Sequence, residues 1–259
     1  MVLKKELRED IKRQLIAKIK AKIQGYDFSK KSGNPFIDII FGKYSNIKSF
    51  IHGMATTLGS DYEIIARKIA SANPSFVESK KMAFTGKISD AESVVVKNIA
   101  KDLEGSKKSS DYEGEIKAIY AANSDKTREI KITIDLYLKD KTGKEFFIEM
   151  KGPDPNKKEV RAAKEDLLNV VAMKKRDVDL KKFMDKVAII FGVYYNNKES
   201  QYDNWKVSPL FEKDKGLFVQ EEFWDFLGGK GTFSEMLEII TEVRDEVKPL
   251  IKQTIESHV

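Results

Sequence analysis

Two strand-like stretches joined by a short glycine-containing turn constrain the fold more than any other part of the chain. Residues 130–138 read Ile-Lys-Ile-Thr-Ile-Asp-Leu-Tyr-Leu, an alternating pattern rich in β-branched and aromatic side chains. Residues 139–144 are typical of a turn, because Gly143 accepts a positive φ. Residues 146–150 return as a second apolar run, which the Gly152-Pro153-Asp154-Pro155 segment ends. We therefore predict a β-hairpin.

Helical patterns precede this hairpin. Apolar residues recur at every fourth position from Leu3 to Ile23, as on one face of an amphipathic helix, and Gly25 is the expected stop. Ser60 or Asp61 is a suitable N-cap for a later helix. The elements predicted before the hairpin are helices at about residues 3–23, 60–70 and 90–103, and a helical turn or small strand at 36–41.

Further elements are expected after the hairpin. Asn156 and Glu159 lie three residues apart, which predicts a capping box for a helix that runs to about Lys175. The nearly continuous apolar run at residues 187–195 indicates a buried strand. The chain is helical again after about residue 205, with a long amphipathic segment at 233–255. This order of elements predicts an α/β core with an N-terminal helical portion.

The length of 259 residues fits one large domain or two small ones, and we expect one. Within it we predict a mainly helical portion over residues 1–105. Residues 106–200 are expected to form a core of hairpin, helix and strand, and residues 201–259 C-terminal helices.

The composition narrows the chemistry that is available. The absence of Cys excludes disulfides, Cys-ligated zinc and thiol catalysis. Two His leave little for a His-based metal cluster or a Ser-His-Asp triad. Catalysis would therefore rest on carboxylates, lysines and hydroxyls. No apolar stretch approaches the roughly 20 residues that span a bilayer, so we expect a cytoplasmic protein without a membrane partner.

The charges are distributed unevenly along the chain, whose formal net charge is +6. Residues 4–22 carry eight Lys and Arg against three acidic residues, and residues 151–182 carry ten against six. Residues 212–246 carry ten acidic residues against four basic ones. The pattern suggests one face for a polyanion and another kept away from it, with solvated helix faces as the equally weighted alternative.

Asp135, Glu149 and Lys151 form the constellation that carries chemistry. Asp135 lies in the first predicted hairpin strand, and Glu149 and Lys151 end the second, where their alternate spacing gives them the same face. Carboxylate oxygens favour Mg²⁺, which completes its shell with water and phosphate. A lysine can orient or deprotonate a water molecule. Two carboxylates and a lysine on one face are suited to metal-assisted hydrolysis of a phosphodiester.

The Glu-x-Lys tripeptide is by itself a weak signal in this chain. It also occurs at Glu115-Ile-Lys117, Glu129-Ile-Lys131 and Glu246-Val-Lys248. Only the copy at Glu149 follows an apolar strand paired with a strand that carries an Asp, and only this copy precedes a Gly-Pro break and a basic helix. Ordinary surface charges on a hairpin are the alternative interpretation.

Asp135 with Glu149-x-Lys151 resembles the signature of the PD-(D/E)xK nuclease superfamily, the fold of most type II restriction endonucleases. Ile134 stands where the signature usually has proline. Several stretches more narrowly resemble the TdeIII/MjaII-type restriction endonucleases, and together they span roughly residues 36–200. They are Ser49-Phe50 to Leu58-Gly59, Tyr62-Glu63-Ile64-Ile65-Ala66, Ile134-Asp135-Leu136-Tyr137-Leu138 and Ile148-Glu149-Met150-Lys151-Gly152-Pro153 to Lys157.

The resemblance implies a restriction-endonuclease-like core, in which helices flank a central mixed sheet, and roles for individual residues. Asp135, Glu149 and the Met150 carbonyl would hold Mg²⁺, and Lys151 would position the attacking water. A glutamate on an N-terminal helix often joins such a site. Glu63 matches that place, with Glu92 as its rival, and a solvated helix residue is the alternative for Glu63.

The resemblance also implies the partners. They are double-stranded DNA, a second copy of the chain to form a homodimer, and a cognate DNA methyltransferase of the same restriction–modification system. The substrate would be a short palindrome such as GGNCC, cut to give 5′-phosphate ends. The rival hypotheses are a structure-selective or repair nuclease on the same fold, and a DNA-binding protein without enzymatic activity.

A basic helix is predicted directly after the hairpin. Its candidate DNA contacts are Lys157, Lys158, Arg161 and Lys164, of which the first, third and fourth share a face. Such side chains grip phosphates or reach guanine in the major groove. A solvated basic helix is the alternative.

Overall fold

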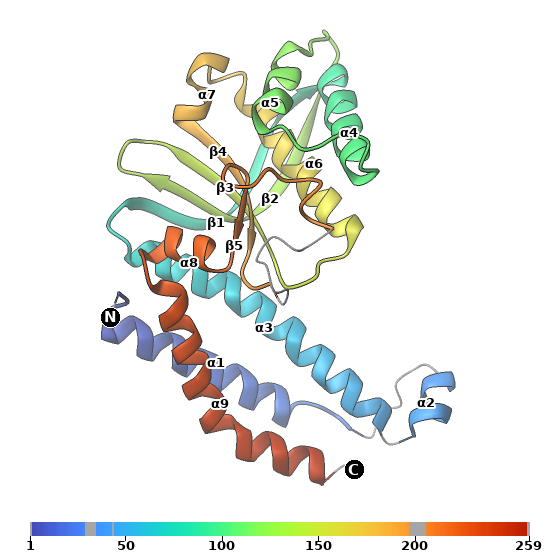
Figure 1. Ribbon diagram of the computed structural model, residues 1–259, viewed down its shortest axis with the longest axis vertical. Helices are drawn as coiled ribbons and strands as arrows, with labels where there is room; N and C mark the ends of the chain where they lie inside the picture. The colour runs from blue at the N-terminus through green and yellow to red at the C-terminus, as the bar shows by residue number, and fades with distance from the viewer. Residues whose placement is uncertain (1, 29–34, 43, 197–205, 258–259) are drawn as a thin grey trace. The chain divides into compact units, whose positions relative to one another are not determined.

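The computed structural model describes residues 2–28, 35–42, 44–196 and 206–257, and its elements are labelled in Figure 1. The chain divides into two compact units. The first comprises Met1–Ile65 and Lys230–Val259, and the second comprises Ala66–Gly229. The single-domain organisation expected from the length stays a prediction. Within the described ranges, no helix combines the length and the apolar character needed to cross a membrane.

The first unit is helical in its described residues. It contains α1 (Lys5–Gln24), α2 (Pro35–Phe41), most of α3 (Tyr44–Ala72) and α9 (Thr232–Glu256). The helix α1 ends where Gly25 predicts, and the Gly25 amide donates to the Ala21 carbonyl at 2.9 Å. Buried apolar residues of α1, such as Ile11 and Leu15, form the stripe expected from the four-residue repeat.

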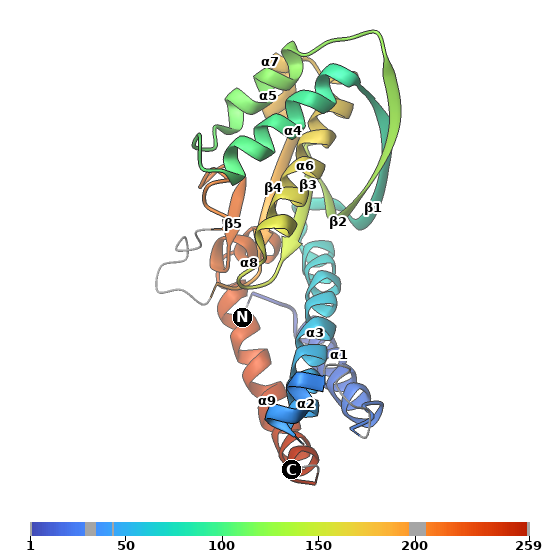
Figure 2. The same ribbon diagram turned by 90° about the vertical axis from the view of Figure 1, so that its right-hand side faces the viewer.

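The basic helix α1 and the acidic helix α9 run beside each other (Figures 1 and 2). Arg8 pairs with Glu238 at 3.2 Å and also with Glu242. Lys20 pairs with Glu246 at 3.2 Å. The expectation of separate basic and acidic faces is therefore wrong for these two segments, because their opposite charges meet and offset each other.

The helix α3 begins sixteen positions earlier than predicted, at Tyr44 rather than at Ser60. Ser60 and Asp61 therefore lie inside the helix and do not cap it. The Asp61 carboxylate is buried and accepts a hydrogen bond from Gln14 of α1 at 2.9 Å. Gln14 is distant in sequence from Asp61. The local sequence therefore predicted a helix cap at a residue whose side chain makes a tertiary contact. The run at 36–41 is the helix α2, one of the two alternatives expected.

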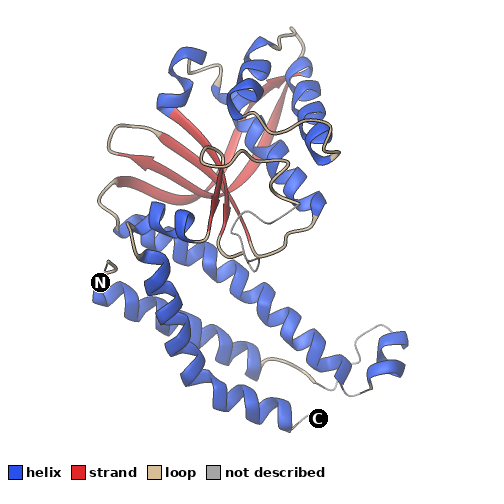
Figure 3. Ribbon diagram, in the orientation of Figure 1, coloured by secondary structure: helices blue, strands red, loops and turns tan. Residues whose placement is uncertain are grey.

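A five-stranded sheet forms the centre of the second unit (Figure 3). Its order is β1 (Phe76–Ser89), β2 (Thr127–Asp140), β3 (Glu145–Lys151), β4 (Val187–Val193) and β5 (Leu217–Val219). The β1–β2 and β2–β3 pairs are antiparallel, whereas β3–β4 and β4–β5 are parallel. The hairpin is β2–β3, and the sheet is mixed, as predicted.

Helices complete this α/β unit. The capping box of Asn156 and Glu159 is present at the start of α6, as predicted. Leu167 and Val171 of α6 are fully buried in the core cluster of the unit, which also holds Phe147 and Phe191 of the sheet. The helices are α4 (Asp90–Glu104), α5 (Tyr112–Ala121), α6 (Lys157–Lys174), α7 (Leu180–Lys186) and α8 (Glu221–Gly228).

Two strands lie outside the sequence prediction. The 14-residue strand β1 falls within the portion expected to be mainly helical, and β5 falls in the segment expected to be helical after residue 205. The second half of β1 alternates, with Met82, Phe84 and Ile88 at every second position, but the Lys80-Lys81 pair and Gly86 interrupt the pattern. Its pairing along nearly the whole of β2 stabilises it as a strand.

Candidate active site

Asp135 lies where the two hairpin strands separate. The β2–β3 ladder runs from the Lys139–Glu145 pair to the Leu136–Ile148 pair. The Asp135 side chain follows directly, and its Oδ2 accepts a hydrogen bond from the Met150 amide at 3.0 Å. The carboxylate therefore bridges to β3 at the point where the backbone ladder ends.

A β-bulge shapes β2 at the same place. Lys80 pairs with Tyr137 and Met82 with Ile134, so that Asp135 and Leu136 together face the single residue Lys81 of β1. A bulge leaves a ladder position unpaired and redirects a side chain. Arg67, from the last part of α3, donates to the Asp135 carbonyl at 2.9 Å. This hydrogen bond fixes the backbone of the bulge.

Lys151 lies between the two candidate metal-binding carboxylates. Its Nζ is 3.6 Å from Glu149 Oε2 and 3.7 Å from Asp135 Oδ2. Glu149 and Lys151 occupy alternate positions of β3, which directs both side chains to one face. The structure therefore brings together the three side chains that the sequence singled out. Their catalytic roles stay a proposal.

Glu149 is the most perturbed group of this site. Burial, which leaves 6% of the residue exposed, raises the pKa of its carboxyl from the ordinary 4.5 to about 8. The negative charge of Asp135 adds to the rise, and Lys151 opposes it. Glu149 Oε1 is buried and has no hydrogen-bond partner within the described ranges. A buried oxygen of this kind is costly unless a cation or a proton satisfies it.

The side chains fit a Mg²⁺ ion that shares its shell with water and substrate. Asp135 and Glu149 supply two hard oxygen donors, and the Met150 carbonyl lies on the same strand as Glu149. Among the residues that the structure describes, no group of three or more His, Cys, Asp or Glu side chains could hold a metal by itself. Mg²⁺ tolerates such a sparse protein shell, because it retains waters and takes phosphate oxygens.

The two glutamates considered as a further acidic residue differ in their surroundings. Glu92 is buried, caps α4 with Ser89, and pairs with Lys175 at 2.7 Å and Arg176 at 3.0 Å. Burial alone would raise its pKa, but these bonds lower it overall. Glu92 therefore fastens α4 to the end of α6, which argues against it as the metal-binding rival. Glu63 lies on α3 in the first unit and stays a prediction.

The helix α6 presents only part of the expected basic face. Lys157 and Lys158 are exposed at its start. Arg161 pairs with Glu165 at 2.8 Å and Glu104 at 3.1 Å. These three residues stay candidates for phosphate contact.

Lys164 is a correction to the predicted DNA contacts. Its side chain is 2% exposed, and its Nζ lies 2.5 Å from the Glu115 carboxylate and 4.8 Å from the centre of the Phe211 ring. Burial lowers the pKa of the Lys164 amine, against the attraction of Glu115. A basic spacing on a helix does not show which side chain turns inward, so only the partner on α5 reveals that Lys164 belongs to the core.

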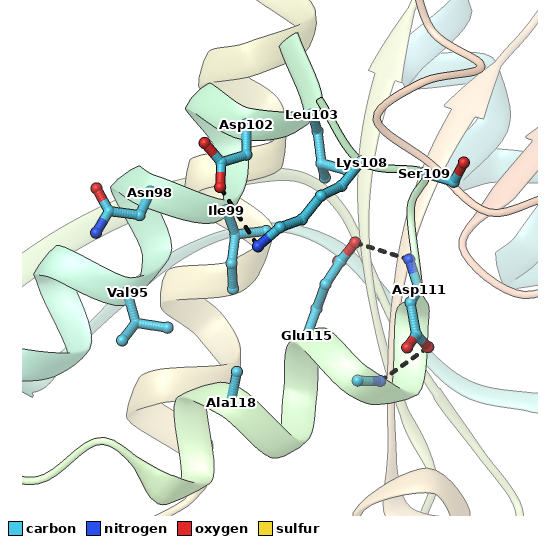
Figure 4. Close-up of a pocket in the computed structure, with 11 residues that line it drawn as sticks. Val95, Asn98, Ile99, Asp102, Leu103, Lys108, Ser109, Asp111, Glu115 and Ala118 are labelled. Atoms are coloured by element: carbon cyan, nitrogen blue, oxygen red, sulfur yellow. Dashed lines mark hydrogen bonds and ion pairs between the residues drawn. The ribbon is translucent and has the colours of Figure 1, made fainter. Parts of the chain in front are cut away.

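A hollow of about 360 Å³ lies between α4, α5 and their connecting loop, and Figure 4 shows its lining. Lys108 pairs with Asp102 at 3.5 Å across it. Glu115 Oε1 accepts hydrogen bonds from the Ser110 hydroxyl at 3.0 Å and the Asp111 amide at 3.2 Å. These contacts hold the connecting loop to α4 and α5. None of Asp135, Glu149 and Lys151 lines this hollow.

Sequence reasoning missed two residues of the site because it missed β1. Lys81 lies on this strand, with its Nζ 3.8 Å from Asp135 Oδ1, and Arg67 secures the bulge that β1 and β2 form. A third residue, Asp166 of α6, is half-buried, and its charge interacts with Asp135 and Lys151. Had the register between β1 and β2 been known, the position of Lys81 opposite Asp135 would have indicated that Lys81 belongs to the site.

The sequence places the chain in a class of proteins, the type II restriction endonuclease families. The family model described as "Type II restriction endonuclease, HinfI" matches residues 3–244. The chain therefore belongs to the HinfI type II restriction endonuclease family, which confirms the predicted class and its α/β fold.

Curated relatives carry the same description. The chain is 28% identical to the type II restriction enzyme MjaII of Methanocaldococcus jannaschii over 230 residues, which cover 83% of this chain and 58% of that enzyme. It is 27% identical to HgiEI and 29% identical to HgiCII, type II restriction enzymes of Herpetosiphon aurantiacus, over 113 residues in each case. Those matches cover 43% of this chain and 40% of each relative. The chain thus spans less than two thirds of the length of each of these relatives.

Proposed function

We propose that the protein hydrolyses phosphodiester bonds of duplex DNA at a short palindromic sequence, with Mg²⁺ as its cofactor, and leaves 5′-phosphate ends. The observation that carries this proposal is the convergence of Asp135, Glu149 and Lys151 around a buried carboxylate oxygen without a hydrogen-bond partner in the described part of the chain. Family membership supports DNA as the substrate.

The proposed roles follow from the contacts. Asp135, Glu149 and the Met150 carbonyl would hold the ion, which would supply positive charge beside the scissile phosphate. The Met150 amide and Arg67 fix Asp135 from two sides, so its carboxylate is oriented before substrate arrives. Glu149 would bind the ion in its ionised form, since carboxyl groups coordinate metals as carboxylates.

Lys151 is the proposed group that orients the attacking water. Its ammonium lies within 4 Å of both carboxylates and its side chain remains 30% exposed, so solvent reaches it. An ammonium in that position donates a hydrogen bond to a water and offsets negative charge near the reacting phosphate. Truncation to alanine removes this donor and leaves both carboxylates in place.

The remaining parts of the proposal concern DNA and partners. Lys157, Lys158 and Arg161 at the start of α6 contact phosphates beside the cleavage site. The enzyme acts as a homodimer, since two-fold symmetry in the protein matches a palindrome. Glu63 adds a further carboxylate. The recognition sequence is GGNCC, and a DNA methyltransferase of the same system protects it.

Digestion of a mapped plasmid tests the proposal. With Mg²⁺, discrete fragments are expected whose sequenced ends share one palindrome and carry 5′-phosphates. EDTA should abolish the fragments. Cutting confined to branched or damaged DNA would support a structure-selective nuclease instead. Binding to DNA without cleavage under any divalent ion would support the non-enzymatic alternative.

A further inference from the structure

We propose that Lys81 binds a DNA phosphate at the active site, as a second cation that the β-bulge of β1 and β2 places opposite Asp135. This inference rests on the proposed nuclease function and adds a positioning residue to it. Lys81 belongs to the strand that the sequence does not reveal, and it lies well away in sequence from the basic helix α6.

The bulge determines where Lys81 points. Lys81 is the single β1 residue between the Lys80–Tyr137 and Met82–Ile134 pairs, and it faces the two bulged residues, Asp135 and Leu136. Its Nζ is 3.8 Å from Asp135 Oδ1. Lys151 approaches the other oxygen, Oδ2, at 3.7 Å. The two ammonium groups therefore flank the same carboxylate from opposite oxygens.

The contact between Lys81 and Asp135 is too weak to be a structural requirement. The Lys81 side chain is 50% exposed, and the two charged atoms are separated by more than a hydrogen-bond length. Exposed ion pairs contribute only about 0–1 kcal/mol. Asp135 already has the Met150 amide on Oδ2 and Arg67 on its carbonyl. Asp135 therefore keeps its position when the Lys81 ammonium moves toward a stronger anion.

The charges of the site create a need for such a cation. Asp135 and the half-buried Asp166 place negative charges beside the site, and these charges repel a phosphodiester. Lys151 lies between Asp135 and Glu149, so its single positive charge is shared between these carboxyl groups and the phosphate. Lys81 is the more exposed of the two lysines, and its flexible stem lets the ammonium follow a phosphate as a point charge.

The test compares Lys81→Ala with Lys80→Ala, its neighbour on the same strand. Lys80 pairs with Glu78 and lies 5.4 Å from the centre of the Tyr137 ring, so it serves as a matched control. Affinity for a short duplex that contains the mapped cleavage site is measured in EDTA by fluorescence anisotropy from 50 to 200 mM salt. Loss of one phosphate contact makes the negative slope of log association constant against log salt concentration less steep by about 0.9. The ratio of wild-type affinity to Lys81→Ala affinity therefore falls about 3.5-fold between 50 and 200 mM salt.

Three outcomes decide the proposal. It predicts a reduced slope and a lower kcat/KM for Lys81→Ala, a slope restored by Lys81→Arg, and wild-type behaviour for Lys80→Ala. Lys81→Gln keeps most of the stem and replaces the alanine variant if that one does not fold. If Lys81→Ala keeps the wild-type slope and the wild type cleaves DNA, the role of Lys81 alone is overturned. A wild type that never cleaves DNA would instead overturn the proposed function.

Discussion

The buried pair of Lys164 and Glu115 gives the sharpest test of the structure against the sequence, because the sequence predicts a DNA contact at Lys164. Both side chains are almost fully buried, at 2% and 7% exposure, and their charged atoms are 2.5 Å apart. Lys164→Met leaves the Glu115 charge uncompensated in the core, which costs about 3–5 kcal/mol. For a protein of this size that loss lowers Tm by roughly 6–20 °C.

A second substitution should recover most of this loss. Glu115→Gln removes the stranded charge and keeps Oε1 as the acceptor for the Ser110 hydroxyl and the Asp111 amide. The double variant Lys164→Met/Glu115→Gln is therefore expected to be more stable than Lys164→Met alone, because it leaves no uncompensated charge in the core. Urea unfolding followed by circular dichroism measures both values.

The exposed residue Lys158 on the same helix is the matched control. Lys158→Met is expected to change stability by less than about 0.5 kcal/mol and to weaken binding of duplex DNA. The double variant at Lys164 and Glu115 should bind DNA as tightly as wild type in EDTA. If the double variant is no more stable than Lys164→Met, or if the folded double variant loses DNA affinity, the assignment of Lys164 to the core is wrong.

Two further predictions concern the metal site. The raised pKa of Glu149 means that the folded, metal-free protein holds this proton more tightly than the unfolded chain. The contribution of Glu149 to stability is therefore present at low pH and falls as the pH rises from about 4.5 to about 8. Glu149→Gln should remove that fall from the curve of Tm against pH, and an unchanged curve would contradict the burial of Glu149. Mg²⁺ at about 100 times its Kd should stabilise the wild type, and the control variant Glu129→Gln, by about 2.7 kcal/mol in a thermal melt. Equal stabilisation of Asp135→Asn would contradict ion binding at Asp135.

The parts of the fold that the sequence predicted are those determined by local chemistry. The hairpin follows from side-chain alternation and the turn at Gly143, and the start of α6 follows from the hydrogen bonds of Asn156 and Glu159. Gly25 likewise ends α1. The proximity of Asp135, Glu149 and Lys151 was predictable because strand geometry and a short turn allow few other arrangements.

The parts that the sequence missed depend on partners far away in the chain. The strand β1 is stabilised by its pairing along β2, and the Lys80-Lys81 pair and Gly86 interrupt the apolar alternation of its own residues. Lys164 and Glu92 are buried because Glu115 in one case, and Lys175 and Arg176 in the other, neutralise them. A buried basic residue and a solvated one can occupy the same positions of a helix pattern. The spacing of charged residues in the sequence could therefore not show which of them is buried.

The rate of Mg²⁺-dependent plasmid cleavage by two matched lysine variants tests the central claim most directly. Lys151 and Lys131 both end a Glu-x-Lys tripeptide on a strand of the same sheet, but Lys131 is exposed on β2. With equal DNA binding, Lys151→Ala should cleave about 10²–10⁴-fold more slowly than wild type, and Lys131→Ala should cleave normally. Equal cleavage by the two variants would contradict catalysis by Asp135, Glu149 and Lys151.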